Sequence, residues 1–419
     1  MGIDRSEHPC FSASARHQFA RVHVPVAPQC NIKCRYCNRK NDCVNESRPG
    51  VTSKVLLPHQ ALHYVGELLN YDDRIRVVGI AGPGDCFATP ETSLETLRLI
   101  RAHYPSMLLC VATNGLAVLD YVDEVAMLDV SHVTITMNAV DPDIGEHIYS
   151  WARLDKQIFR GRAAAELLIE RQKAAIQALS KAGVMVKINT VIIPGINDEH
   201  AQEVARTVAS LGAQVQNCLP LYPSPDTEFA NYEQPGTEIM GDVRRKSEIF
   251  IPQMRHCGRC RADAVGILGE EINDQILGLL EDASNLTPAP TADRPYVAVA
   301  SHEGILVNQH LGEADQFWIL GKKGTQIELV GTRPAPAKGT GNNRWELLAD
   351  ELKDCRMVLV SGAGPKPKSI LKESGLHVEV TEGLIMDLTS QIFAGRKIKA
   401  VNRPHKCGAT CSGDATGCG

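Results

Sequence analysis

Apolar runs alternate with amphipathic segments between residues 21 and 222. The apolar runs span residues 21–27, 74–82, 107–115, 132–140, 184–193 and 214–222. Segments between them, such as 57–69 and 164–183, place apolar residues three and four positions apart, as a helix with one buried face does. Strands that are apolar nearly throughout, each followed by a helix, pair in parallel with both faces covered. The pattern therefore predicts six βα units.

The fold class that fits this order best is an α/β fold with a partial (βα)6 barrel. Ligands of such barrels bind at the C-terminal ends of the strands, in the loops that follow. The cysteine-rich stretch 30–43 follows the first run, GPGD (82–85) the second and TNG (113–115) the third, and MN (137–138) ends the fourth. We therefore expect the functional site at this edge of the sheet.

The chain changes character after the barrel. Pro, Ala and Thr dominate residues 283–294, which predicts a linker. Strand-like and helix-like segments then follow in mixed order and predict a smaller mixed α/β domain over 295–405. Residues 406–419 are rich in Gly and Cys and predict a flexible tail. We thus expect a barrel with an N-terminal extension (1–282) and a second, smaller domain.

Composition narrows the function classes. The chain has 419 residues, 43% of them hydrophobic, which is enough for more than one core. The formal net charge of −5 gives no basic surface for nucleic acid, and no apolar run is long enough to span a membrane. The N-terminus lacks the apolar segment of a secretory signal. Fourteen cysteines in such a chain predict reduced thiols in the cytoplasm that bind metal or do redox chemistry.

Three cysteines stand at CxxxCxxC spacing, namely Cys30, Cys34 and Cys37. Zinc is one interpretation, because closely spaced cysteines of cytosolic proteins commonly bind structural zinc. Zinc sites usually join two CxxC pairs into a four-ligand tetrahedron, whereas these three thiols share one loop. Three thiolates would hold three irons of a 4Fe-4S cube and leave the fourth iron open to another ligand. The spacing therefore favours an iron–sulfur cluster.

With Tyr36 immediately before the last of these cysteines, and with GPGD after the second strand, the loop resembles the cluster motif of the radical S-adenosylmethionine (SAM) superfamily. The resemblance implies that the open iron binds the amino and carboxylate groups of SAM, and that an electron from the cluster releases a 5′-deoxyadenosyl radical. It also implies SAM-binding positions at Tyr36, Gly82, Pro83, Gly84, Asp85, Thr113, Asn114, Asn138 and Ile193. The glycines would let the backbone approach SAM, because they carry no Cβ.

Six more residues could bind metal, which is more than one cube needs. They are His23, Cys43, Cys110, Cys10, Cys257 and Cys260. The first three could form one group near the SAM pocket, and the last three another where the N-terminal extension meets the end of the barrel.

Each of these residues also has a structural interpretation. A lone cysteine on an apolar strand is often a small core residue, and for Cys110 this alternative stays open. A core position is our expectation for Cys86, Cys218 and Cys355. Cys257 and Cys260 could instead form a minor zinc site or a solvent-facing thiol pair.

Longer stretches resemble the nitrogenase cofactor biosynthesis (NifB) family: HPCF at 8–11, the run 19–51 around the cysteines, and MRHCGRCRADAVGILGE at 254–270. The part that follows resembles a ribonuclease H-like, NifX-type module that binds iron–molybdenum cofactor, in HLGEADQFWIL (310–320) and MVLVSGAG (357–364).

This resemblance implies that two substrate 4Fe-4S clusters, one at each three-residue group named above, are fused with an added sulfide into an 8Fe-9S cluster with a central carbide. The carbide carbon would be the methyl group of one SAM, and a second SAM would supply the radical. The implied cofactors are three 4Fe-4S clusters and SAM. The implied partners are an iron–sulfur cluster donor, nitrogenase cofactor maturation or carrier proteins, and an electron donor such as ferredoxin or flavodoxin.

Conversion of a methyl group to a carbide also requires a proton acceptor. Glu46, a few residues beyond Cys43, is our candidate catalytic residue, with Arg48 beside it to position an anion. Glu46 could instead cap the backbone N–H groups of a turn. In the second domain, His302 and His310 are candidate contacts to the product cluster.

Two other functions stay open. One is a different radical SAM enzyme, which modifies a peptide or small molecule and uses the extra cysteines for auxiliary clusters. The other is a non-catalytic iron–sulfur scaffold or carrier. Three four-iron clusters predict about twelve irons per chain, and a scaffold would not cleave SAM.

Overall fold

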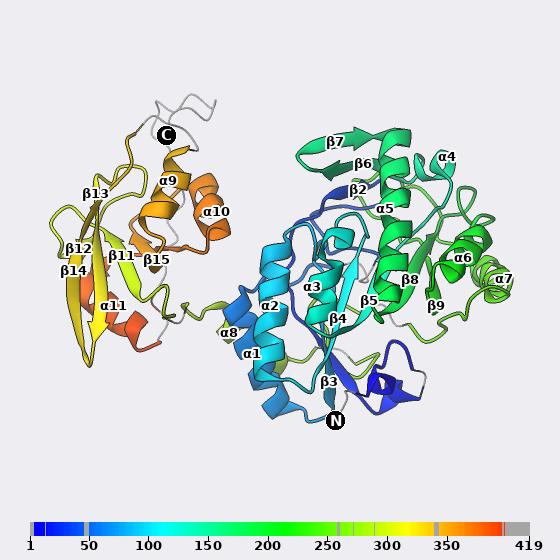
Figure 1. Ribbon diagram of the computed structural model, residues 1–419, viewed down its shortest axis with the longest axis horizontal. Coiled ribbons are helices and arrows are strands. Elements are labelled where there is room, and N and C mark those ends of the chain that lie inside the picture. The colour runs from blue at the N-terminus through cyan, green and yellow to red at the C-terminus, as the bar shows by residue number, and fades with distance from the viewer. Residues whose placement is uncertain are drawn as a thin grey trace. The chain divides into compact units, whose positions relative to one another are not determined.

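The computed structural model describes residues 4–398, apart from 13, 46–49, 258–259, 271, 289, 339–342 and 396–397. The chain divides into two compact units, residues 1–284 and 285–419, each with hydrophobic cores of its own (Figure 1). Helix α8 (Asp274–Ser284) closes the first unit, so the predicted linker begins inside this helix. Within the described ranges, no helix is long and apolar enough to cross a membrane.

A seven-stranded sheet forms the centre of the first unit and confirms the predicted partial barrel. Six of its strands correspond to the six predicted runs and pair in parallel, in the order β1-β3-β4-β5-β8-β9. Their bounds are β1 (Ala20–His23), β3 (Ile75–Ile80), β4 (Leu108–Thr113), β5 (Val130–Thr136), β8 (Met185–Ile192) and β9 (Val215–Pro220). A short strand, β10 (Val265–Gly266), pairs antiparallel with β1 at the edge.

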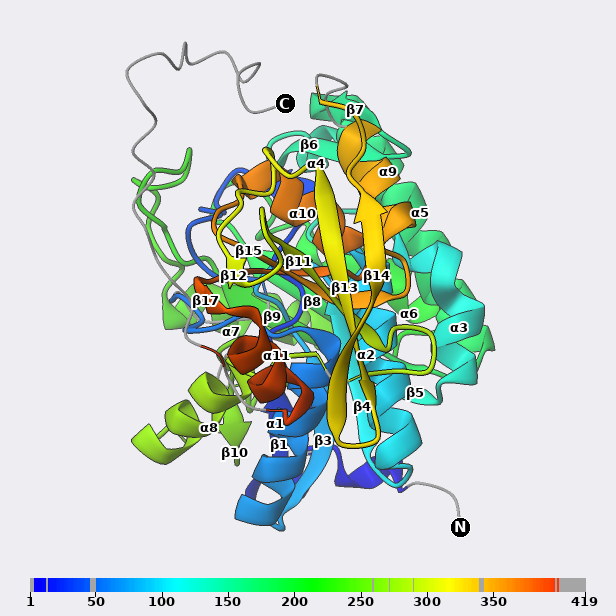
Figure 2. The same cartoon turned by 90° about the vertical axis from the view of Figure 1, so that its left-hand side faces the viewer.

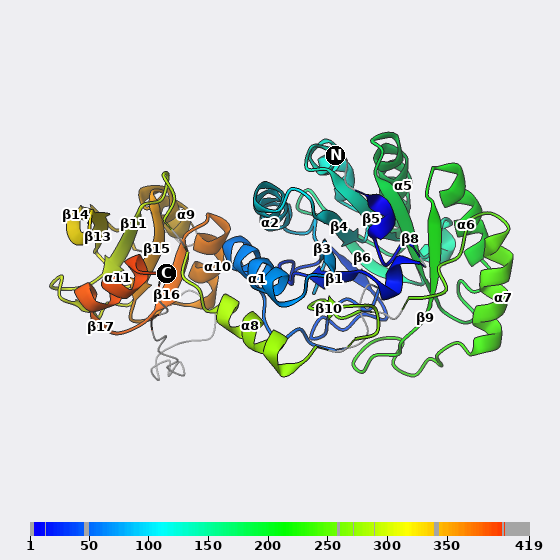
Figure 3. The same ribbon diagram turned by 90° about the horizontal axis from the view of Figure 1, so that it is seen from below.

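Helices line the outer side of this sheet, as the amphipathic segments predict (Figure 3). The longer ones are α1 (Pro58–Tyr71), α2 (Pro90–His103), α5 (Gly161–Lys181), α6 (Ala201–Ser210) and α7 (Thr237–Glu248). The shorter ones are α3 (Val122–Met127), α4 (Pro142–Gly145) and the 3-10 helices η1 (Arg5–Glu7), η2 (Ala15–His17) and η3 (Val118–Tyr121). Helix α5 ends just before Gly183, whose φ of 77° lies in the left-handed region that favours glycine.

Successive residues of the barrel strands point to opposite faces of the sheet, and the two faces differ in chemistry. Val22 on β1 and Val111 on β4 belong to the hydrophobic core. The residues between such core positions are polar or carry sulfur: Arg21, His23, Cys110, His132, Lys187 and Asn189. The sequence predicted strands that are apolar on both faces. Both faces are buried, but the face away from the helices carries the chemistry.

A three-stranded antiparallel sheet lies outside the predicted elements. It consists of β2 (Ile32–Cys34), β6 (Tyr149–Leu154) and β7 (Gln157–Arg160), in the order β2-β6-β7. The β6–β7 hairpin turns at Asp155 and Lys156, which both have positive φ, 49° and 67°. Such turns usually carry Asn-Gly or Asp-Gly, and Asp-Lys at 155–156 does not indicate a hairpin.

The second unit is a mixed α/β domain, as predicted. Its five-stranded sheet has the order β14-β13-β11-β15-β16, in which β11 and β15 pair in parallel and β11 and β13 antiparallel. The strands are β11 (Tyr296–Ala300), β13 (Gln316–Lys323), β14 (Gln326–Pro334), β15 (Cys355–Val360) and β16 (His377–Val380). A small pair, β12 (Leu306–Val307) with β17 (Gly383–Leu384), is separate. Figure 2 shows β13 and β14 as a long paired ribbon.

Helices cover both faces of this second sheet. Ala298 and Val358 pack in one core with helices α9 (Asn343–Glu351) and α10 (Pro365–Glu373). Val297, the neighbour of Ala298, packs in another core with α11 (Ile385–Phe393). Both faces are therefore apolar, unlike those of the barrel sheet.

Candidate metal and cofactor site

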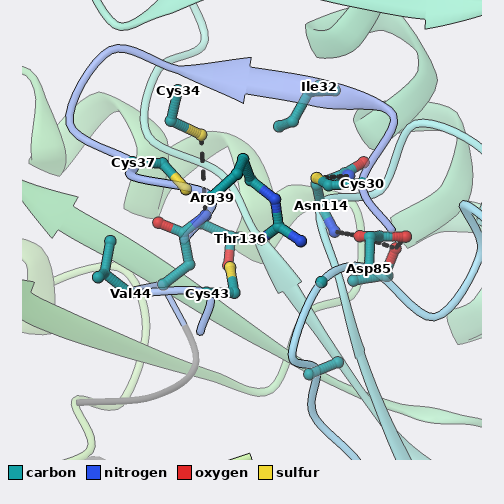
Figure 4. Close-up of a pocket in the computed structure, with 14 residues that line it drawn as sticks. Cys30, Ile32, Cys34, Cys37, Arg39, Cys43, Val44, Asp85, Asn114 and Thr136 are labelled. Atoms are coloured by element: carbon teal, nitrogen blue, oxygen red, sulfur yellow. Dashed lines mark hydrogen bonds between the residues drawn. The ribbon is translucent and has the colours of Figure 1, made fainter. Parts of the chain in front are cut away.

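The three cysteines of the CxxxCxxC stretch gather around one pocket beyond the strand ends (Figure 4). The pocket region contains about 410 Å³ of space outside protein atoms, part of which is open solvent. Its lining residues are Cys30, Ile32, Cys34, Cys37, Arg39, Cys43, Val44, Asn45, Gly84, Asp85, Ala112, Thr113, Asn114 and Thr136. A space with three sulfur donors on its wall fits the predicted iron–sulfur cluster.

Strand β2 fixes the first part of the cysteine loop. Its residues pair with β6, so that Cys34 lies opposite Tyr149. The N–H of Arg35 donates to the carbonyl of Ile148 at 2.9 Å, and the N–H of Cys37 donates to the carbonyl of Cys34 at 3.0 Å. These backbone bonds hold the second and third cysteines close together.

The GPGD loop packs directly against the backbone that leads into the cysteines. The N–H of Gly84 donates to the carbonyl of Ala27 at 2.6 Å. A Cβ at position 84 would lie 1.9 Å from the carbonyl oxygen of Gln29, a distance that no side chain tolerates. Gly84 is thus required by the protein's own backbone. The sequence alone predicts only that this glycine admits SAM.

Asp85 ties the loops after β3 and β4 together. Its buried carboxylate accepts hydrogen bonds from Thr113 Oγ1 at 3.0 Å and from the N–H groups of Asn114 and Phe87, at 2.5 and 2.9 Å. Burial raises the pKa of this carboxyl group, and the bonds from Asn114, Phe87 and Thr113 oppose the rise.

The side chain of Asn114 links the loop after β4 to the cysteine loop. Its Nδ2 donates to Asn31 Oδ1 at 2.6 Å and lies 3.8 Å from the sulfur of Cys30. The two predicted motifs, GPGD and TNG, therefore hold the first cysteine in place.

Tyr36, Asn138 and Ile193 lie behind the pocket. All three are fully buried, and none is among the residues that line it. The hydroxyl of Tyr36 donates to Asn45 Oδ1 and accepts from Asn138 Nδ2, both at 2.7 Å. In turn, Asn45 Nδ2 lies 3.9 Å from the sulfur of Cys34. Tyr36 and Asn138, two of the predicted SAM contacts, therefore support the pocket wall through Asn45.

Arg39 is a site residue that the sequence analysis missed. Its side chain stands among the cysteines in Figure 4 and donates to the carbonyls of Pro28 at 2.7 Å and Pro83 at 3.3 Å. Burial lowers the pKa of its guanidinium, but the thiols of Cys30 and Cys37 outweigh burial and raise it. The sequence feature that could have identified it is its position, two residues after Cys37.

His23 and Cys110 come together on the polar face of the barrel sheet. Gly79, on the strand between them, makes this possible: a Cβ there would lie 3.2 Å from His23 Cδ2 and 3.7 Å from the sulfur of Cys110. His23 Nδ1 donates to the carbonyl of Arg261 at 3.1 Å, which leaves Nε2 as the lone-pair nitrogen. Burial, followed by the charge of Arg21, lowers the pKa of His23 to about 4.

Cys43, predicted to join His23 and Cys110, lines the pocket of the CxxxCxxC cysteines. Its N–H donates to the carbonyl of Pro83 at 2.9 Å, which anchors it to the GPGD loop.

Cys10 lies within electrostatic reach of Cys257 and Cys260, although most of the barrel unit separates it from them in the sequence. His256 Nε2 donates to the carbonyl of Pro9 at 3.1 Å, across 247 positions of sequence. Burial raises the pKa of the Cys10 thiol to about 11; Lys187 opposes this rise and Cys260 adds to it.

Arg21 and Lys187 are cations of this region, and neither was a predicted site residue. Arg21 Nη2 donates to the sulfur of Cys260 at 2.9 Å. Lys187 Nζ lies 5.5 Å from the ring centre of Phe11, next to Cys10 in the chain. Both come from the polar face of the sheet, which the apolar runs in the sequence did not reveal.

Glu46 and Arg48 lie outside the described residues. Cys86, Cys218 and Cys355 are buried core residues, as expected. In the second unit, His310 Nδ1 accepts from the N–H of Gly312 at 3.1 Å, and His302 is exposed.

In the part of the chain that the structure describes, no three His, Cys, Asp or Glu side chains lie close enough to share one metal ion. Around a four-iron cube, three cysteines bind three different irons, so such close contact is not required of them.

Two family models match the chain, one in each unit. The family described as "Radical SAM superfamily" matches residues 24–208, and the family "Dinitrogenase iron-molybdenum cofactor" matches residues 294–395. The "FeMo cofactor biosynthesis protein NifB" of Chlorobaculum tepidum is 51% identical, over 100% of both chains. The protein of the same description from Klebsiella pneumoniae is 38% identical, over 88% of this chain and 86% of its own.

Among solved structures, Streptococcus suis SuiB bound to S-adenosylmethionine aligns with 55% of this chain and 47% of its own, at 14% identity and a TM-score of 0.38. This likeness is too slight to support conclusions about chemistry.

Proposed function

The chain belongs to the family of FeMo cofactor biosynthesis proteins NifB, within the radical SAM superfamily, and from this membership we propose that it makes the carbide-centred precursor of the nitrogenase cofactor. Two 4Fe-4S substrate clusters are fused, with a carbon from SAM and an added sulfide, into an 8Fe-9S cluster. This is the activity of a lyase or transferase type of cofactor synthase in the cytoplasm.

The observation that carries the proposal is the gathering of Cys30, Cys34 and Cys37 around one pocket. These three cysteines would hold a 4Fe-4S cluster, which would supply the electron that cleaves SAM. Asp85 and Asn114 keep Cys30 in place, and the Arg39 guanidinium faces the sulfur atoms with a positive charge. GPGD and TNG offer backbone and side-chain groups to SAM at the pocket wall, which Tyr36 and Asn138 support.

Two further groups would hold the substrate clusters, namely His23, Cys43 and Cys110, and Cys10, Cys257 and Cys260. Three ligands leave one iron of each cube free, which suits a cluster that is transformed and released. His23 supports this role in two ways: its Nδ1 is engaged by a carbonyl, and its low pKa keeps Nε2 unprotonated at neutral pH. A neutral imidazole also binds iron less firmly than a thiolate does.

The remaining roles rest on the family and the sequence. Glu46 is the proposed acceptor for the protons lost on the way to the carbide, and Arg48 positions an anion beside it. The second unit, a member of the dinitrogenase iron-molybdenum cofactor family, would hold or pass on the product. A cluster donor, a cofactor carrier or maturation protein, and a ferredoxin or flavodoxin are the proposed partners.

Anaerobic reconstitution tests the proposal. We expect about twelve irons per chain, two of the three clusters unresponsive to SAM by electron paramagnetic resonance (EPR), and methyl-labelled SAM carbon retained in the extracted product. SAM cleavage with four irons alone would favour a radical SAM enzyme of another substrate class. Iron binding without SAM cleavage would favour a scaffold.

A further inference from the structure

Arg21 is a buried cation on the polar face of the barrel sheet. Its side chain is 2% exposed and is among the largest fully buried side chains of the protein. Nη1 donates to the carbonyls of Gly266 and Ile267, the latter at 3.0 Å, and Nη2 donates to the sulfur of Cys260 at 2.9 Å. Its Nε is buried without a hydrogen-bond partner. The guanidinium is therefore aimed at a sulfur atom.

The charge of Arg21 lacks a carboxylate to balance it. No ion pair of Arg21 occurs among the described residues, and its remaining partners are neutral carbonyls. Burial of a charge is strongly unfavourable unless an opposite charge compensates it. A second cation, Lys187, is 7% exposed and acts electrostatically on Cys10 together with Arg21. Arg21, a buried cation that donates to one of three neighbouring thiols, therefore calls for an anionic occupant.

A three-thiolate iron–sulfur cluster supplies that charge. A cubane core with two positive charges, held by three thiolates, has a net charge of minus one and becomes more negative on reduction. The pocket of Cys30, Cys34 and Cys37 also has a cation beside its thiols, since the guanidinium of Arg39 faces the sulfur atoms. Each of these two thiol groups is thus met by one guanidinium.

We propose that Arg21 is the charge-balancing and positioning residue of the cluster bound by Cys10, Cys257 and Cys260, through its hydrogen bond to the sulfur of Cys260. This inference rests on the proposed function, because it requires a cluster at that site. Arg21 retains the cluster through charge, and it tunes the reduction potential because a hydrogen bond to a ligand sulfur stabilises the reduced, more negative state.

The test compares Arg21→Gln and Arg21→Lys with wild type after anaerobic reconstitution. Arg21→Gln removes the charge, so we expect it to lose about four of about twelve irons, together with one EPR signal that does not respond to SAM. Arg21→Lys keeps the charge but not the guanidinium geometry. We expect it to retain the iron and to show a more negative midpoint potential for that one cluster.

Arg101→Gln is the matched control in the same unit. Arg101 is half-buried and donates to the carbonyls of Leu128, Met107 and Asp129, with no sulfur partner. We expect this variant to keep the iron content and all potentials of wild type. The SAM-responsive EPR signal reports whether the barrel of each variant is folded.

The outcomes separate this inference from the proposed function. If wild type itself holds only four irons, the proposed function fails and no cluster exists for Arg21 to balance. If wild type holds about twelve irons and Arg21→Gln holds as many, the inference alone is overturned. Equal iron loss in Arg21→Lys and Arg21→Gln would overturn the charge argument. Should Arg21→Gln not fold, unchanged potentials in Arg21→Lys would overturn the role of the hydrogen bond.

Discussion

The barrel unit assembles two groups of three cysteines in different ways. Cys30, Cys34 and Cys37 come from one short loop, which backbone hydrogen bonds to β6 and to the GPGD segment hold in shape. Cys10 and Cys260 come from opposite ends of the unit, and their segments are tied together by side chains, such as the bond of His256 to the carbonyl of Pro9 across 247 positions. The first group depends on local chain geometry, and the second depends on the folding of the whole barrel.

This difference bears on how each site fails. We expect the local group to fail when a ligand or its backbone support is changed. We expect the distant group to fail when the N-terminal segment detaches, even if every ligand is intact. Arg21 on β1 and Lys187 on β8 lie near the distant group alone.

The largest expected effect is that of Cys34→Ala in the local group. A cube held by two thiolates cannot present its open iron, so we expect loss of detectable 5′-deoxyadenosine formation with reductant and SAM, and loss of about four irons per chain. Cys218→Ala is the control, because Cys218 is a buried core cysteine on β9 whose sulfur donates to Gln253 Oε1 at 3.3 Å. SAM cleavage that persisted in Cys34→Ala would remove the cluster assignment.

Gly84→Ala disrupts the backbone packing that supports the local group. The new Cβ would meet the carbonyl oxygen of Gln29 at 1.9 Å, so the loop must move. We expect a loss of about 3 kcal/mol in unfolding free energy and, from a displaced cluster loop, about a hundredfold slower SAM cleavage.

Gly278→Ala provides the comparison for this substitution. Nothing lies within 4 Å of a Cβ at Gly278, in helix α8, so we expect a change within about 1 kcal/mol and normal SAM cleavage. Thermal and chemical unfolding measure both variants. Equal stability of the two would contradict the close approach at Gly84.

We expect low pH to destabilise the distant group before the local group, because buried histidines anchor the N-terminal segment. The ring of His132 lies 4.3 Å from that of His8 and 4.2 Å from that of Phe11. Burial, followed by the charges of Arg5 and Lys187, lowers the pKa of His132 to about 3. The unfolded state then binds more protons, so stability present above the unfolded pKa of about 6.5 is lost as the pH falls toward 3.

His132→Phe keeps an aromatic ring and cannot titrate. We expect the metal-free variant to lose about 2 kcal/mol less unfolding free energy than wild type between about pH 7 and pH 5. Anaerobic urea titrations at several pH values measure the difference. Parallel pH profiles for the two proteins would show that the His132 ring does not stay neutral in the folded state.

Deletion of residues 285–419 is expected to have the smallest effect on either group. The barrel unit has its own hydrophobic core, and every proposed ligand precedes residue 285. We expect SAM cleavage within about twofold of the full chain and the same iron content. A truncated protein that folds but does not cleave SAM would show that the second unit completes the site.

The sequence determined the elements that depend on local patterns. Six apolar runs became the six parallel strands, and the chain of the second unit became a mixed α/β domain. The spacing of Cys30, Cys34 and Cys37 sufficed to place them at one pocket, because a short loop cannot carry them far apart.

The tertiary structure alone decided what depends on distant partners. The periodicity of β1 shows that Arg21 alternates with Val22, but only the closed sheet brings Arg21 to Cys260. The sequence does not show that a side chain at position 84 is excluded. The folded backbone does, because the carbonyl of Gln29 occupies the place of a Cβ. The physical reason is the same in both cases: hydrophobic pattern reports whether a residue is buried, whereas charge balance and close approach depend on which groups fold against it.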